Sequence, residues 1–130
     1  MLGKLVVILV VLISLGSAET IQVDGYNFTF EMNKNHIIDN DTIRTYYGFV
    51  NPVVVNGSGV YLRKEYVFIG TTNSRNEIFQ IYERGGEDSD PQFFAIDASL
   101  FPNSTICVHS TMNLTDTIDF LKTLKVEKIK

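Results

Sequence analysis

Residues 26–32 read YNFTFEM, and this stretch decides the fold class because its side chains alternate. Every second residue, from Tyr26 to Met32, is aromatic or apolar, and the residues between them are polar. A period of two is typical of a β-strand with one dry face and one wet face. We therefore expect Phe28 and Phe30 to face a hydrophobic core and Asn27 to face water.

Similar runs of β-branched and aromatic residues recur along the chain, separated by clusters of Gly, Pro, Asn, Asp or Ser. The sequence Asn56-Gly57-Ser58-Gly59 is the strongest hairpin signal, and strands joined by such short loops pair antiparallel. Pro52 and Pro91 are expected at strand starts or on an edge, and the disturbed alternation at residues 63–65 indicates a bulge. We predict strands near residues 20–23, 26–32, 43–50, 52–55, 60–69, 77–83, 92–97 and 105–111.

The tail changes to helical spacing from Asn113 onward, with acidic residues early and lysines late. Asn113 or Thr115 can cap the first turn. The expected fold class is all-β: about eight short antiparallel strands forming a small barrel or a two-layer sandwich, with one short C-terminal α-helix. The chain contains no Trp, so it lacks the Gly-x-Trp motif of lipocalins and the Cys-Trp-Cys pattern of immunoglobulin domains. We assign no family.

The first 18 residues have the order of a cleaved secretory signal. A lysine precedes an apolar run from Leu5 to Ile13, and small residues lead to an expected cut between Ala18 and Glu19. A bilayer span needs about 20 apolar residues, so this run is too short to serve as an anchor. The prediction is a signal peptide at 1–18 and a single secreted, extracellular domain at 19–130, with no membrane span.

The charge balance of residues 19–130 is mildly acidic. Lys4 is the only charged residue before position 19, so 10 basic residues face 15 acidic ones and the net charge is −5. Such a chain is not attracted to phosphate backbones or anionic membrane surfaces, and we expect no nucleic-acid partner.

Five Asn-x-Ser/Thr acceptor patterns occur where random placement of 10 Asn and 17 Ser or Thr predicts about 1.5. The excess predicts a glycoprotein, and each glycan must face water. The alternative is that turn-rich β sequences generate such tripeptides. The predicted acceptors are Asn27, Asn40, Asn56, Asn103 and Asn113.

Cys107 is the one cysteine, so it cannot form a disulfide within the chain. Two interpretations stay open: a buried core residue, or an outward thiol that links two chains as a disulfide-bonded dimer. The dimer gains weight if Ile106 and Val108 face the core. Cys107 and His109 share one strand face, but their side chains are roughly 7 Å apart by strand rise, so we expect no Cys-His catalysis.

No constellation predicts an enzyme, a metal site or a cofactor, because the spacing of His, Cys and carboxylates matches none of these sites. The first hypothesis is a non-enzymatic binding protein that contacts a protein or glycan partner through loops and an exposed sheet face, with Tyr46, Tyr61 and Tyr66 pointing outward. The alternative is a lipocalin-like carrier of a small hydrophobic ligand inside a barrel. That barrel would be lined by Tyr26, Phe28, Phe30, Tyr47, Phe49, Phe79, Ile81, Phe94 and Ile96.

Overall fold

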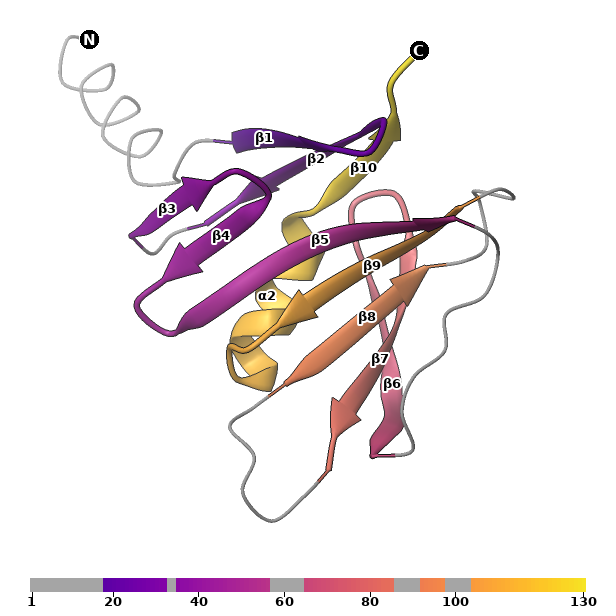
Figure 1. The fold of residues 1–130 in the computed structure, drawn as a ribbon. Helices are drawn as coiled ribbons and strands as arrows, with labels where there is room; N and C mark the ends of the chain where they lie inside the picture. Colours follow the sequence, from indigo (N-terminus) through magenta and orange to yellow (C-terminus); the bar gives the residue numbers. More distant parts are fainter. Residues whose placement is uncertain (1–17, 33–34, 57–64, 86–91, 98–103) are drawn as a thin grey trace, which may run out of the picture.

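A computed structural model describes residues 18–32, 35–56, 65–85, 92–97 and 104–130. These residues form ten antiparallel strands in two sheets and one α-helix (Figure 1), which confirms the predicted fold class. The helix is α2 (Leu114–Thr123). The strands are β1 (Ala18–Val23), β2 (Tyr26–Glu31), β3 (His36–Asp39), β4 (Thr42–Thr45), β5 (Gly48–Asn56), β6 (Tyr66–Asn73), β7 (Ile78–Arg84), β8 (Phe93–Asp97), β9 (Ser104–Ser110) and β10 (Lys125–Lys128).

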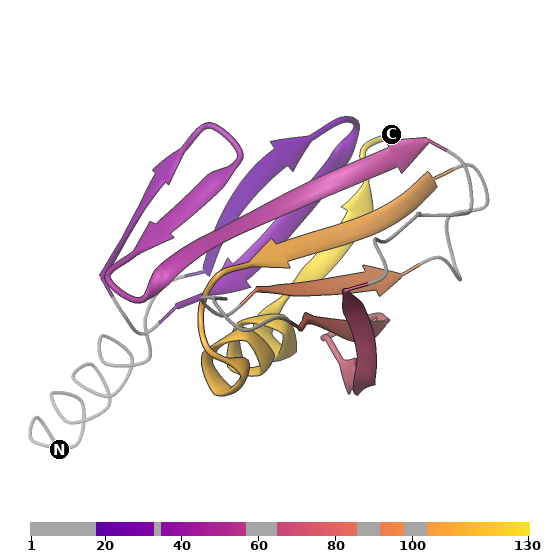
Figure 2. The same cartoon turned by 60° about the horizontal axis from the view of Figure 1, so that its bottom comes forward.

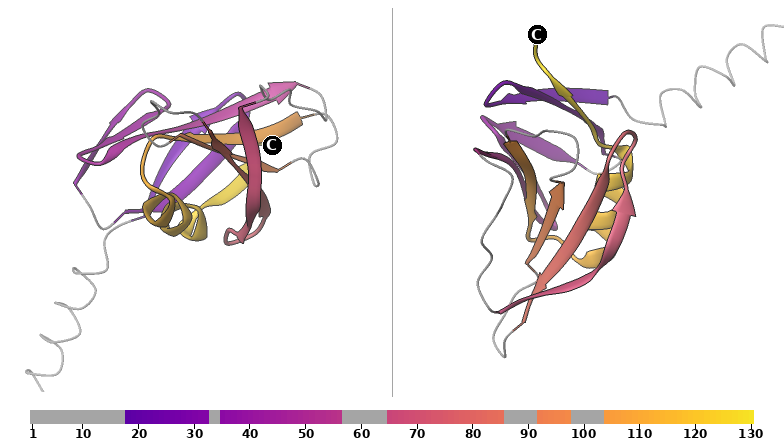
Figure 3. Two further views of the ribbon diagram at one scale, coloured as in Figure 1. Left: turned by 90° about the horizontal axis from the view of Figure 1, so that it is seen from below. Right: turned by 90° about the vertical axis from the view of Figure 1, so that its right-hand side faces the viewer.

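The two sheets have three and seven strands and do not close into a barrel. The smaller sheet has the order β1-β2-β10, and the larger has the order β3-β4-β5-β9-β8-β7-β6. The smaller sheet covers one face of the larger, and α2 lies between β2 and β6 (Figures 2 and 3). Within the described ranges, no helix has the length and apolar character needed to cross a bilayer.

The core lies between the two sheets, and β2 supplies its centre as the alternation predicted. Tyr26, Phe28 and Phe30 are 5%, 0% and 1% exposed, whereas Asn27 is half-buried. Burial of each such aromatic side chain stabilises the fold by about 2–3 kcal/mol relative to exposure. Ile106 and Val108 of β9 also face this core, because both are fully buried opposite the inward residues of β5.

The predicted hairpin at Asn56-Gly57-Ser58-Gly59 does not pair the strands on either side of it. Residues 57–64 lie outside the described ones, but β5 pairs with β4 and β9, while β6 pairs with β7 at the far edge of the sheet. The turn signal is local, whereas strand pairing is decided by burial across the whole sheet. The bulge predicted at 63–65 falls mostly outside the described residues; among the described ones, β6 breaks its register between Phe68 and Gly70.

Pro52 lies inside β5 rather than at its start. Phe49 C=O accepts a hydrogen bond from Thr111 N–H of the segment after β9, so by alternation the missing N–H of Pro52 faces the β4 side. Pairing with β4 ends at Val50. Pro52 therefore lies at an unpaired edge of β5 on that side. It removes no ladder hydrogen bond, which is why proline is tolerated at an edge position, as predicted.

Two strands appear where none was expected, and one predicted strand is divided. β3 lies in the polar stretch read as a loop, and its Ile37 is 71% exposed because β3 is an edge strand. β10 follows the helix in a tail whose helical spacing concealed a short alternation around Val126. The run 43–50 is interrupted by a turn at Tyr46 and Tyr47, which separates β4 from β5.

Candidate functional site

The outer face of the seven-stranded sheet carries a row of rings. Phe93 and Ala95 of β8 are buried against the core, so Phe94 points to the opposite side. Cross-strand register places one outward residue per strand beside it. In order across the sheet, these residues are Asn51, His109, Phe94, Tyr82 and Phe68.

Aromatic contacts join these rings in two groups, and cross-strand register places Tyr82 of one group beside Phe94 of the other. Phe94 stacks on His109 with ring centroids 4.7 Å apart, and Tyr66 meets Phe94 edge-on at 5.1 Å. Phe68 meets Tyr82 edge-on at 5.6 Å. Such pairs each contribute about 0.5–1.5 kcal/mol beyond their burial. We call this surface the aromatic face, made of Phe49, Tyr66, Phe68, Tyr82, Phe94 and His109.

The aromatic face remains partly open to solvent. Phe49 and Phe68, at opposite sides of the row, are 49% and 52% exposed, and Val53, also outward on β5, is 40% exposed. Single exposed apolar residues are ordinary on protein surfaces, whereas a contiguous apolar group marks an interaction site. The row could not be predicted from the sequence, because it depends on which side of each strand faces outward and on the pairing of β5 with β9, which are far apart in the chain.

Among the described residues, few charged side chains lie on the aromatic face. Arg84 is the only formally charged residue among the outward positions of β5, β7, β8 and β9 that the structure describes. Arg44 of β4 lies over the Phe49 ring at 5.6 Å and also approaches Asp39 at 3.6 Å. An apolar centre with arginine at its margin and few carboxylates is the composition that protein interfaces favour.

Cys107 and His109 share the outward side of β9, as predicted, but their protonation does not suit catalysis. Burial raises the pKa of the Cys107 thiol to about 11 and lowers the pKa of His109. A catalytic cysteine requires a lowered thiol pKa, which favours the reactive thiolate. Although Ile106 and Val108 face the core, Cys107 is itself only 3% exposed, which does not favour a disulfide between two chains.

None of the four predicted glycan acceptors that the structure describes belongs to the aromatic face. Asn40 lies in the exposed β3–β4 turn with φ 56°, and Asn56 is exposed at the end of β5. Asn113 is exposed at the start of α2, where its Oδ1 accepts a hydrogen bond from Asp116 N–H at 2.8 Å. Asn27 is half-buried in the three-stranded sheet, and Asn103 lies outside the described residues.

The residues predicted to line a ligand cavity do not share one interior surface. Five of them are buried in the packed core, whereas Tyr47 and Phe49 are about half exposed and Phe94 and Ile96 face outward from β8. The five buried residues are Tyr26, Phe28, Phe30, Phe79 and Ile81. The alternating pattern correctly predicted strands at β5 and β8. In both strands, however, the residues that face inward are the neighbours of those predicted, because Val50 and Ala95 face the core.

One half-open hollow of about 120 Å³ lies beside α2, away from most of those residues. Met32, Met112 and Phe120 form its apolar part, and Glu31, Asp116, Asp119 and Thr123 complete its lining. Ligand pockets usually measure about 300–1,000 Å³, so this hollow is small for a hydrophobic cargo. Among the described residues, no three His, Cys, Asp or Glu side chains gather closely enough to hold a metal ion.

A buried carboxyl pair was not predicted from the sequence. Glu77 is 7% exposed and Asp97 is 1% exposed, and a side-chain hydrogen bond joins them. The signal was present in the alternation, since Asp97 follows the inward Phe93 and Ala95 at two-residue steps. The pair could not be predicted from that signal alone, because Glu77 comes from the turn between β6 and β7 and meets Asp97 only in the folded chain.

Comparison with known proteins identified no matching family model, no curated relative and no matching solved structure.

Proposed function

We propose that this chain is a secreted glycoprotein that binds an extracellular protein through the aromatic face. The observation that carries the proposal is the group of partly exposed rings that five strands, β5 to β9, place on one face of the sheet, from Phe49 to Phe68. Aromatic residues and arginine supply most of the binding energy at the centre of protein interfaces, and this surface contains both.

Two further features support a protein partner of complementary charge. The exposed acceptors Asn40, Asn56 and Asn113 all lie off the aromatic face, so glycans at these positions would leave it uncovered. Among the residues that the structure describes, the outward positions around Arg84 provide no carboxylate, so these positions would not complement Arg84 of a second copy of the chain. A partner with an apolar centre and carboxylates at its rim fits better.

The test begins by locating the contact on the protein. A photo-crosslinking amino acid replaces Phe68 in one sample and Glu127, on the three-stranded sheet, in another, and the secreted proteins are exposed to intact cells of the source tissue. We expect a cross-linked product from position 68 and not from position 127. The identified partner is then purified, and its affinity is measured by surface plasmon resonance.

With purified components, Phe68→Ala is expected to weaken binding by about 30-fold, the effect of an interface residue worth about 2 kcal/mol. A glycan gives a second test. Ile69→Asn creates an acceptor at a 40% exposed position beside Phe68, and Ile37→Thr makes exposed Asn35 an acceptor just before β3, at the opposite edge of the sheet from Phe68. The first glycan should abolish binding and the second should leave it unchanged. If Phe68→Ala, Ile69→Asn and Ile37→Thr all bound the partner as tightly as the natural chain does, the proposal would be refuted.

A further inference from the structure

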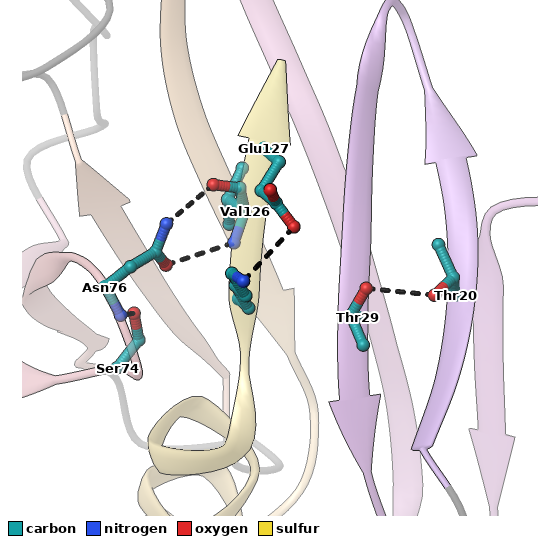
Figure 4. Close-up of polar contacts among 7 residues, drawn as sticks. Thr20, Thr29, Ser74, Asn76, Val126 and Glu127 are labelled. Atoms are coloured by element: carbon teal, nitrogen blue, oxygen red, sulfur yellow. Dashed lines mark hydrogen bonds and ion pairs between the residues drawn. The ribbon is translucent and has the colours of Figure 1, made fainter. Parts of the chain in front are cut away.

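At the tip of the β6–β7 hairpin, the side-chain amide of Asn76 hydrogen-bonds the backbone of β10, as the backbone of a neighbouring strand would. Asn76 Nδ2 donates to Val126 C=O at 2.8 Å, and Val126 N–H donates to Asn76 Oδ1 at 3.1 Å (Figure 4). Arg75 N–H adds a bond to Leu124 C=O at 2.9 Å. These bonds connect the open edge of the seven-stranded sheet to the edge of the three-stranded sheet.

The next residue in the same turn, Glu77, is held by Asp97 of β8. Two hydrogen-bonded carboxyl groups must share a proton, since only the protonated group can donate. Glu77 Oε2 is also buried and has no hydrogen-bond partner among the described residues. A negative charge on Glu77 would therefore be poorly solvated and would stand beside Asp97.

Other charges near this turn do not compensate for that arrangement. Lys125 and Glu127 lie on the opposite side of β10 from buried Val126 and approach one another at 3.5 Å, and Arg75 is exposed. The surfaces of α2, β5 and β9 that face the core are formed by apolar and hydroxyl side chains, including Leu121, Val54 and Ile106. Asp97 is the charged group that acts on Glu77.

We propose that the Glu77–Asp97 pair is a proton-operated latch, which holds the β6–β7 turn on β8 and β10 when the pair is protonated and releases the turn when the proton is lost. Burial, the hydrogen bond that protonated Glu77 donates to Asp97, and the charge of Asp97 raise the pKa of Glu77 from 4.5 to about 7. The latch is closed in mild acid and opens as the pH passes through neutrality.

The latch regulates the aromatic face, and this consequence rests on the proposed function. The hairpin that it holds carries Phe68 and Tyr82, and Tyr66 begins the same strand. Release of the turn loosens the strands that position these rings. Partner binding is then stronger at pH 6 than at pH 8, and Glu77→Gln removes most of that difference.

The test of the latch itself needs no partner. Amide hydrogen exchange is measured at pH 6 and pH 8, corrected for intrinsic exchange, in the natural chain, in Glu77→Gln and in Glu83→Gln, a control at an exposed position of β7. Val126 N–H reports the latch because its acceptor is Asn76 Oδ1. Phe28 N–H, in the central strand β2, reports opening of the whole domain.

We expect protection at Val126 to fall at least 10-fold from pH 6 to pH 8 in the natural chain and in Glu83→Gln, but not in Glu77→Gln, while Phe28 stays protected. Asp97→Asn removes the charge repulsion but leaves Glu77 buried, so its loss of protection at Val126 should be smaller than in the natural chain; it serves if Glu77→Gln folds poorly. Protection at Val126 that does not depend on pH, or an equal loss at Phe28, overturns the proposal.

Discussion

Replacement of Glu77 by glutamine should remove the loss of stability that rising pH causes in the natural chain. Glu77 has an ordinary pKa of 4.5, which the folded structure raises to about 7. Between these values the folded chain keeps a proton that the unfolded chain has released. The stabilising contribution of this group is therefore complete below pH 4.5 and is lost as the pH rises through 7.

The magnitude follows from the size of that difference. A shift of about 2.5 pH units corresponds to about 3 kcal/mol of unfolding free energy at 1.36 kcal/mol per unit. The glutamine side chain of the variant is neutral at every pH and retains a donor for Asp97. We expect Glu77→Gln and the natural chain to differ by about 1 kcal/mol or less at pH 4.5, and the variant to be more stable by up to about 3 kcal/mol at pH 8.

Urea unfolding followed by far-ultraviolet circular dichroism measures both free energies on unglycosylated protein. The relevant quantity is the difference between variant and natural chain at each pH, because other carboxyl groups affect both proteins equally. Glu83→Gln, at an exposed position, supplies the control and should show no pH-dependent difference. A difference for Glu77→Gln that is the same at pH 4.5 and pH 8 would refute the reasoning.

Three other predictions concern the helix, the thiol and a turn. Asn113→Ala should lower the unfolding free energy by about 1 kcal/mol in chemical denaturation, whereas Asn113→Asp, which also removes the glycan acceptor, should retain the cap and most of the stability. Cys107 in the native fold should react with iodoacetamide at pH 8 about 100-fold more slowly than in urea, because burial raises its pKa to about 11; equal rates would contradict its burial. Gly48→Ala should destabilise the fold by more than about 2 kcal/mol in thermal melts, since φ is 139° and a Cβ would lie 2.7 Å from Thr111 Oγ1. Gly25→Ala, with φ 89° and open space around it, should cost only about 1 kcal/mol.

Local patterns predicted the parts of this fold that depend on neighbouring residues. The alternation in β2 correctly identified Phe28 and Phe30 as core residues, because strand geometry alone sends consecutive side chains to opposite faces. Asn113, one of the two helix caps that the sequence predicted, is confirmed for a similar reason, since its Oδ1 accepts a hydrogen bond from an N–H only three residues away. In each case the partner lies within the same segment.

The candidate site could not be predicted in the same way. Phe94 and Ile96 were assigned to an interior because they are apolar, yet Phe93 and Ala95 proved to be the inward residues of β8. When apolar residues occupy every position of a strand, the sequence does not show which side chains face inward. The orientation of such a strand is decided by the strands and the second sheet that pack against it.

The sequence alone determined a mostly β chain with a short capped helix near its end and a central strand with one buried side, because these features depend on residue spacing of two or about four positions. Only the tertiary structure decided which strands are neighbours, and hence that rings from β5 to β9 form one row and that Glu77 meets Asp97. Such contacts join residues far apart in the chain, and burial summed over both sheets selects among the pairings that local patterns leave equally open.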